Sequence, residues 1–295
     1  METGDSVHES LLEAVSEQDI SKIMEIFQRF NNYPRLYRSE LNIDEALNVS
    51  IPTENLKLIQ LLLSAGANAK YTDDSGRRAI HLAAMTGNVD VVKLILREGC
   101  PVNVPNREGK TPLHLAIETG KEELVELLLD IGANINRAQI YQTNEYPIHV
   151  AVKRGFLHII NLLQSRGANL EATAAYKRTP LHYAIMHKQF RVVEHLCRLH
   201  VDVNAKDIRG DTPLALAMSH GSIDTIHLLL RFDAKVDIAL KNDVTVLHYL
   251  PQLMNKQAEP DAHRQLYDTL IRAAGDCINR VSDNGTPLHA AVSAK

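Results

Sequence analysis

The 295-residue chain contains no tryptophan, and aromatic residues make up only 5% of it. A core with so few large rings must be filled mainly by aliphatic side chains, as in packed helices. The three cysteines, Cys100, Cys197 and Cys277, are far apart and match no pairing or metal spacing. This excludes a disulfide scaffold and indicates a reducing compartment. No run approaches the roughly 18–20 apolar residues that span a bilayer, so we expect no membrane insertion.

Neither sign of charge dominates, because 32 Lys and Arg residues face 36 Asp and Glu residues, for a net charge of −4. A protein that coats nucleic acid is therefore disfavoured. Motifs for a Walker A loop, a zinc protease, a serine hydrolase or a kinase are also missing. The sequence predicts a non-catalytic protein with no cofactor, no metal and no small-molecule substrate.

What the chain has instead is an internal repeat. The phrase RRAIHLAAMTG returns as KTPLHLAIETG, EYPIHVAVKRG, RTPLHYAIMHK and DTPLALAMSHG. The marker position in these phrases advances in steps of 33, 35, 33, 33 and 33 residues, through His81, His114, His149, His182, Ala215 and His248. A period of about 33 residues indicates stacked supersecondary units, each of which buries its apolar face only against its neighbours.

Each unit reads as two short helices and a polar hairpin. Threonine is a good N-cap, proline fits the first helical position, and a glycine ends the helix. The second helix carries apolar residues at helical spacing, and we expect the leucines Leu94 and Leu127 to lie in the core. Away from the marker position, the histidines are not spaced with cysteines or carboxylates as a set of metal ligands would be; they are His187, His195, His200, His220 and His227.

The TPLHLA phrase and the glycine phrase, such as GANIN, resemble the ankyrin repeat over nearly the whole chain, from about Glu9 to Lys295. The resemblance implies an all-α ankyrin-repeat solenoid of helix-turn-helix units joined by β-hairpin-like loops. We expect 1–295 to form a single ankyrin-repeat domain. Its parts are a degenerate N-terminal capping repeat at 1–40, repeats at 41–73, 74–106, 107–141, 142–174, 175–207 and 208–240, a repeat with an insertion (250–265) at 241–281, and a truncated or capping half-repeat at 282–295.

Two features extend this pattern. The hairpin at 137–146 is two residues too long and carries aromatic side chains, so we regard it as a candidate binding edge. The family also implies that asparagines of the G-A-x-x-N phrase can be hydroxylated, although hydrogen bonding is their expected role. The matching residues are Asn103, Asn136, Asn204 and Asn279.

The resemblance implies a protein–protein interaction module. We expect it to be the N-terminal recognition part of a larger adaptor or scaffold, such as a ubiquitin-ligase substrate receptor. Because the chain stops inside a repeat, we expect further sequence, a partner or self-association to cover the end at Lys295. The alternatives are an inhibitor that masks a transcription factor or signalling protein and, from another class, nucleic-acid binding through a basic central groove. The expected location is the cytoplasm, with the nucleus as the alternative.

In ankyrin proteins the hairpin tips and the ends of the first helices line a concave groove. Carried over to this chain, the partner-binding positions are Arg77, Arg107, Lys110, Tyr141, Tyr146, Lys153, Arg154, Tyr176, Arg178, Met186 and Arg209. Arginine and tyrosine are favoured at interface hot spots. We therefore expect a partner segment that is acidic and has apolar anchors, with Arg154, Arg178 and Arg209 exposed to meet it.

Overall fold

A computed structural model gives the fold. It describes residues 4–30, 41–140, 143–220, 222–238, 240, 245–249, 266, 268–273, 275 and 286. Over these residues the secondary structure is helical and contains no strand, which confirms the predicted all-α class. The 250–265 insertion lies outside the described residues, and the repeat boundaries stay a prediction. The chain divides into two compact units, Met1–Gln142 and Thr143–Lys295.

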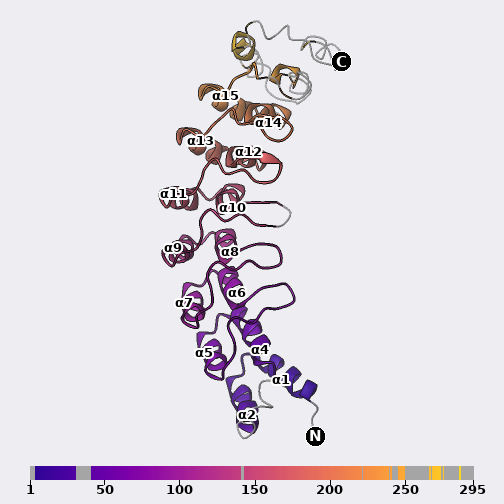
Figure 1. Cartoon of the computed structure of the whole chain (residues 1–295), viewed down its shortest axis with the longest axis vertical. Coiled ribbons are helices and arrows are strands. Elements are labelled where there is room, and N and C mark those ends of the chain that lie inside the picture. Colours follow the sequence, from indigo (N-terminus) through magenta and orange to yellow (C-terminus); the bar gives the residue numbers. More distant parts are fainter. Residues whose placement is uncertain are drawn as a thin grey trace. The chain divides into compact units, whose positions relative to one another are not determined.

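The first unit contains paired helices. They are α1 (Gly4–Ser16), α2 (Ile20–Phe30), α4 (Ile43–Ser50), α5 (Leu56–Ser64), α6 (Ala79–Thr86), α7 (Val89–Arg97), α8 (Pro112–Thr119) and α9 (Glu122–Asp130), with a 3-10 turn η1 (Ile51–Thr53) after α4. The even-numbered helices α4, α6 and α8 pack on one another as an inner row, and α5, α7 and α9 form an outer row (Figure 1). Hairpin loops connect each outer helix to the next inner one.

The second unit repeats this arrangement. Its helices are α10 (Pro147–Arg154), α11 (Leu157–Ser165), α12 (Pro180–Met186), α13 (Phe190–Arg198), α14 (Pro213–His220) and α15 (Ile223–Arg231), with 3-10 turns η2 (Ala175–Lys177) and η4 (Val246–Tyr249). Here α10, α12 and α14 form the inner row, and α13 packs on α15 in the outer row.

The marker histidines are structural. His182 Nδ1 accepts a hydrogen bond from the backbone N–H of Thr179, 3.2 Å away, at the start of its own helix. Its Nε2 lies 3.2 Å from the carbonyl oxygen of Asp211, one repeat further along. His149 makes the equivalent bond to the Arg178 carbonyl, also at 3.2 Å. Each imidazole thus caps one helix and ties it to the next hairpin, which leaves no ring nitrogen for a metal.

The core differs from the sequence-based expectation by one residue in each outer helix. Leu94 and Leu127 are only half-buried, whereas Ile95 and Leu128 are completely buried. A helix turns 100° per residue, so three consecutive apolar residues cannot all face the inner row. The buried face of α7 and of α9 is defined by two adjacent residues and one a turn later, which a run of leucines does not reveal.

This pattern predicts the cost of two neighbouring truncations. Leu128→Ala should lower the free energy of unfolding by about 2–5 kcal/mol, because it leaves a cavity in the core. Leu127→Ala, at a half-buried position on the same helix, should cost less than half as much. Urea unfolding of both variants measures the difference, and equal losses would mean that the assigned core face is wrong.

Candidate protein-interaction site

The second unit exposes two large apolar side chains on neighbouring hairpins. Tyr176 is 61% exposed and Ile208 is 62% exposed. They lie one repeat apart, and the backbone N–H of Ile208 donates a 2.7 Å hydrogen bond to the carbonyl of Tyr176. We call the hairpin segments 143–146, 174–178 and 207–211, together with the C-terminal ends of α10 and α12, the hairpin face of the second unit. Its tips place an aromatic and an aliphatic side chain together in solvent.

The hairpin that carries Tyr176 is strained. Tyr176 and Lys177 have φ angles of 61° and 55°, in the left-handed region that glycine prefers. In the following hairpin the residue equivalent to Lys177 is Gly210. There Asp207 Oδ1 accepts hydrogen bonds from the backbone N–H groups of Arg209 and Asp211, at 2.8 and 3.0 Å. The Tyr176 hairpin has neither the glycine nor, with alanine at 174, the carboxylate. Non-glycine residues in such conformations cost about 1–3 kcal/mol each and cluster at functional sites.

Arg178 holds this hairpin in place, and the expectation that it is an exposed groove charge is wrong. Only 14% of its side chain is exposed, and its Nε lies 3.5 Å from Oδ2 of Asp207, whose side chain is fully buried. Its guanidinium also lies 5.2 Å from the centre of the Tyr176 ring, a cation–π distance. Arg178 therefore neutralises a buried carboxylate and positions an exposed ring.

Removing Arg178 should destabilise the fold. Arg178→Ala leaves the buried Asp207 without a counter-charge and should cost about 3 kcal/mol or more. The exposed Arg154→Ala should change stability by less than about 0.5 kcal/mol. Adding Asp207→Asn to Arg178→Ala should restore part of the loss, since Asn106 already fills the same hairpin position in the first unit. No recovery in thermal unfolding would show that the ion pair is not the cause.

Ion pairs on the hairpin face of the second unit place the cation outside and the carboxylate inside. Lys153 is 42% exposed and lies 3.4 Å from Glu145, whose side chain is 9% exposed. Arg209 is 66% exposed and lies 4.0 Å from Asp211, which is 19% exposed. Burial and the charge of Asp207 raise the pKa of Asp211. The solvent-exposed charge on this hairpin face is therefore mainly positive.

Glu145 is the centre of a polar cluster that the sequence did not reveal. It interacts with Lys153 from α10 and with the hydroxyl of Tyr183 from α12. Burial, followed by the charge of Glu145, raises the pKa of Tyr183, so the phenol stays protonated. Burial and the nearby Lys153 lower the pKa of His187, which keeps this ring neutral near pH 7. Within this cluster, the Lys153 ammonium is the group that is exposed to solvent.

The site residues predicted in the first unit form a different surface. Arg77 donates to Asp73 at 2.8 Å, and Lys110 is more buried than its partner Glu108, at 23% against 65% exposed. Arg107 is exposed. Glu108 thus reaches solvent more than its cation does, whereas Arg77 is more exposed than Asp73, at 36% against 20%. Tyr141 lies outside the described residues.

Two further predicted positions are half-buried. Met186 ends α12, and Tyr146 caps α10, where its backbone N–H donates to His149 Nδ1 at 3.3 Å. The sequence missed Asp207 as the partner of Arg178. A signal was available in the hairpins, which carry Asp or Asn three residues before glycine, a typical pattern for a side chain that caps a turn.

His149 makes stability depend on pH. Burial lowers its pKa to about 4, against an ordinary value of 6.5. Between these values the unfolded chain binds a proton that the folded chain does not. The folded state is therefore favoured above pH 6.5 and loses up to about 3 kcal/mol from this residue as the pH falls to 4. The pKa values of His81 and His182 are lowered in the same direction.

This dependence can be measured by urea unfolding at pH 7.5 and pH 5. The parent should lose stability at the lower pH. His149→Gln should be less stable at both values but should lose distinctly less between them, because glutamine does not titrate. An unchanged pH difference in the variant would contradict the assignment.

The asparagines of the G-A-x-x-N phrase form hydrogen bonds that bridge neighbouring repeats. Asn103 Nδ2 donates to the Gly132 carbonyl at 2.9 Å, and its Oδ1 accepts from the Asn134 N–H at 2.7 Å. Asn204 makes the equivalent bonds to Asp233 and Lys235. This agrees with the hydrogen-bonding role expected for them. Asn279 lies outside the described residues.

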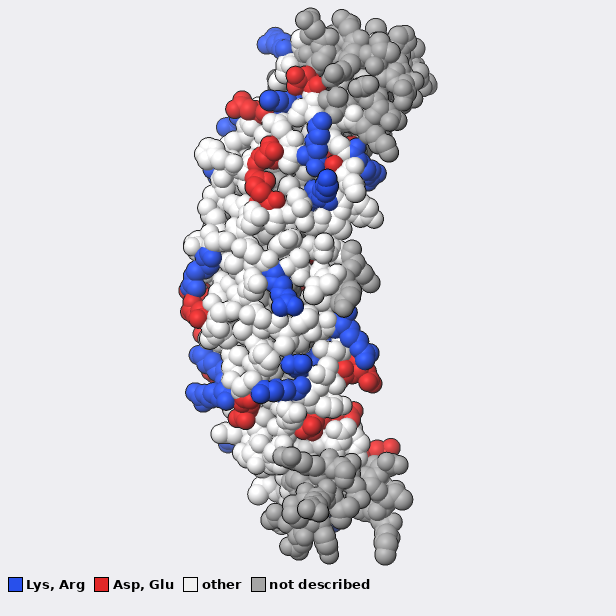
Figure 2. All heavy atoms as spheres, in the orientation of Figure 1, with Lys and Arg blue, Asp and Glu red and all other residues white. Residues whose placement is uncertain are grey.

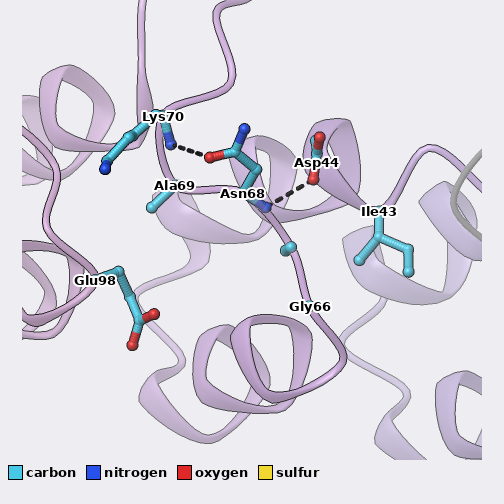
Figure 3. Close-up of a pocket in the computed structure, with 8 residues that line it drawn as sticks. Ile43, Asp44, Gly66, Asn68, Ala69, Lys70 and Glu98 are labelled. Atoms are coloured by element: carbon cyan, nitrogen blue, oxygen red, sulfur yellow. Dashed lines mark hydrogen bonds between the residues drawn. The ribbon is translucent and has the colours of Figure 1, made fainter.

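A pocket of about 420 Å³ lies where the turn after α5 meets the start of α4 (Figure 3). Its polar groups are engaged with one another. Asp44 Oδ1 accepts from the N–H of Asn68 at 2.7 Å, and Asn68 Oδ1 accepts from the N–H of Lys70 at 3.0 Å (Figure 3). These bonds fix the turn, so we assign the pocket no binding role.

Within the described part of the chain, no three His, Cys, Asp or Glu side chains come together as metal ligands would. Its helices are all too short or too polar to cross a bilayer.

Comparison with known proteins agrees with the geometry. Sequence models described as "Ankyrin repeats (3 copies)" match residues 47–139 and 137–207, and one described as "Ankyrin repeat" matches 209–243. The chain belongs to the ankyrin-repeat family. The crystal structure of the human ASB11 ankyrin repeat domain superposes with a TM-score of 0.64 and 26% identity, over 76% of this chain and 96% of that one. Ankyrin repeats are protein–protein interaction modules, and their fold is typically a non-catalytic one.

Curated relatives match over shorter stretches of this ankyrin-repeat chain. NF-kappa-B inhibitor alpha of Gallus gallus is 38% identical over 52 residues, 18% of this chain and 16% of that protein. Transient receptor potential cation channel subfamily A member 1 of Drosophila melanogaster is 31% identical over 119 residues, 40% of this chain and 10% of that protein. The matched stretches are thus a small part of each relative's length.

Proposed function

We propose that this ankyrin-repeat protein binds a partner protein segment through the hairpin face of its second unit, and that the segment carries Asp or Glu beside apolar anchors. The observation that carries the proposal is the exposed pair of Tyr176 and Ile208, held together by a backbone hydrogen bond and flanked by exposed cations. The catalytic motifs are absent from the sequence, so recognition is the chemistry that this surface can supply.

Energetics favour Tyr176 as the anchor. A tyrosine brings a large apolar area and a hydroxyl at low entropic cost, and such residues dominate binding energy at interfaces. Because the Arg178 guanidinium lies 5.2 Å from the centre of the Tyr176 ring, we expect the tyrosine side chain to be restrained in the free protein. A partner then loses less entropy on binding than it would with a mobile ring. Exposed Lys177, Arg154 and Arg209 supply attraction to carboxylates at the rim.

We further propose that the chain serves as the recognition part of a larger adaptor or scaffold, such as a ubiquitin-ligase substrate receptor. The length of the channel relative supports a modular role, since the matched stretch is 10% of that protein. An inhibitor role is the second candidate, favoured by the name of the Gallus gallus relative. Free, buried Cys100 and Cys197 fit a cytoplasmic or nuclear location.

Nucleic-acid binding has less support. Such a protein would present a continuous basic stripe along which a phosphate backbone could run. On the face shown in Figure 2, blue basic side chains are scattered among red acidic ones and broad uncharged areas. The ion pairs of the hairpin face also use part of the positive charge internally.

The test combines selection with two matched variants. Random 12-residue peptides displayed on phage should yield binders in which Asp or Glu stands beside Leu, Ile or Phe. Tyr176→Gly removes the ring and relieves its φ of 61°, so stability should hold while affinity for a selected peptide falls at least about 30-fold. Lys177→Gly relieves the neighbouring residue and keeps the ring, so it should change affinity by less than about fivefold.

Charge is tested separately by fluorescence polarisation at low salt. The variant Arg154→Glu, Lys177→Glu, Arg209→Glu should weaken binding by at least about 20-fold, because three exposed cations become anions. Arg107→Glu in the first unit is the control and should leave affinity nearly unchanged. Selected peptides without acidic residues, or full binding by the triple variant, would contradict the proposal.

A further inference from the structure

The first unit contains a pocket where one repeat departs from the family pattern. Asn48 stands at the marker position, 33 residues before His81. His81 Nδ1 accepts from the Arg78 N–H at 3.0 Å, and its Nε2 lies 2.9 Å from the Val104 carbonyl. Asparagine is shorter than histidine and does not span this distance. Asn48 is only 8% exposed, and its buried Nδ2 makes no hydrogen bond to any residue that the structure describes.

A pocket of about 410 Å³ lies beside this unpartnered amide, between α4 with η1 on one side and the hairpin segment 71–77 on the other. Val49, Pro52 and Leu82 provide apolar walls, and Tyr71 adds a ring. Native structures rarely leave a buried amide unsatisfied, because each such group costs about 1–3 kcal/mol. The shorter side chain therefore leaves an unsatisfied amide beside the pocket.

The charges around the pocket are mainly acidic. Glu45, Asp73 and Asp74 line it with one guanidinium, that of Arg77. Asp73 is engaged, since its Oδ2 accepts from Arg77 Nε at 2.8 Å. Glu45 Oε2 accepts from Asn42 Nδ2 at 2.7 Å and lies 3.3 Å from His8 Nε2. Asp74 is exposed and makes no ion pair with any residue that the structure describes.

We propose that this pocket, which we call the Asn48 pocket, binds a lysine or arginine side chain of a partner protein. The aliphatic stem lies against Val49, Pro52 and Leu82, and the cationic head lies at the carboxylates of Asp74 and Glu45. Asn48 Nδ2 is itself shielded from solvent, so the bound side chain is recognised by the apolar wall and the carboxylates. The inference extends the proposed function, because it gives the interaction module a second contact of opposite charge preference.

Short peptides test the pocket directly. The probes are acetylated and amidated pentapeptides with alanines around a central lysine, arginine, norleucine or glutamate. In two-dimensional NMR spectra of the labelled protein at low salt, the lysine and arginine peptides should shift the signals of residues 45–52 and 71–77 in a saturable way. Norleucine has the stem without the charge, and its peptide should bind at least about fivefold more weakly.

Variants separate the two parts of the pocket. Glu45→Gln with Asp74→Asn should weaken the lysine peptide at least about fivefold, while Glu108→Gln, an exposed carboxylate elsewhere in the unit, should have little effect. Asn48→His restores the family residue and fills the space, and it should abolish binding without loss of thermal stability. If Asn48→His does not fold, the carboxylate variant alone decides.

Three results would overturn the inference: no shift with any probe, equal binding of the norleucine peptide, or unchanged binding by the carboxylate variant. These outcomes are independent of the acidic-segment proposal, which rests on residues of the second unit and on probes of opposite charge. Failure of either proposal is therefore visible without failure of the other.

Discussion

Where the marker residue is a histidine, it bonds to its own helix through one ring nitrogen and to the next repeat through the other, and the hairpins of the binding surface depend on this arrangement. His149 reaches the Arg178 carbonyl and His182 reaches the Asp211 carbonyl, both in hairpins one repeat further along. The imidazole must be neutral to play this part, because it accepts a hydrogen bond at Nδ1. Burial ensures this by lowering the pKa of the ring. The hairpin that displays Tyr176 is thus fixed from the core, through the carbonyl of Arg178.

A hairpin fixed at its base can tolerate strain at its tip. In the Asp207 hairpin a glycine and a side-chain turn remove that strain. The Tyr176 hairpin lacks both and is held from outside its own backbone, by Ile208 of the next hairpin and by the buried pairing of Arg178 with Asp207. Stability alone would favour glycine at 176 and 177. That an exposed tyrosine stands there instead is the reason for placing the binding surface at this point.

The fold follows from the sequence because the repeat phrase encodes it locally. A threonine that caps a helix, a proline that begins it and a glycine that ends it are short-range signals. The 33-residue period repeats them along the chain. The buried face of the outer helices was harder to predict, since a run such as Leu127–Leu128–Leu129 has no gap to show which residue faces inward. The burial of Arg178 could not be predicted, because its partner Asp207 is 29 residues away and meets it only in the stack. Family pattern identifies which positions reach the surface, but pairing between repeats decides which charges remain there.

Net charge was a poor guide to partners for the same reason. The chain is almost neutral, yet in the second unit the carboxylates of Glu145, Asp207 and Asp211 are largely buried beneath more exposed cations. In the first unit Asp74 and Glu108 reach solvent, and Lys110 is partly covered. Near-neutrality therefore conceals local surfaces, because the more exposed partner of an ion pair is a cation at some sites and a carboxylate at others. A single acidic or basic ligand would test only one of them, so the recognition chemistry of this ankyrin-repeat protein has to be assigned unit by unit.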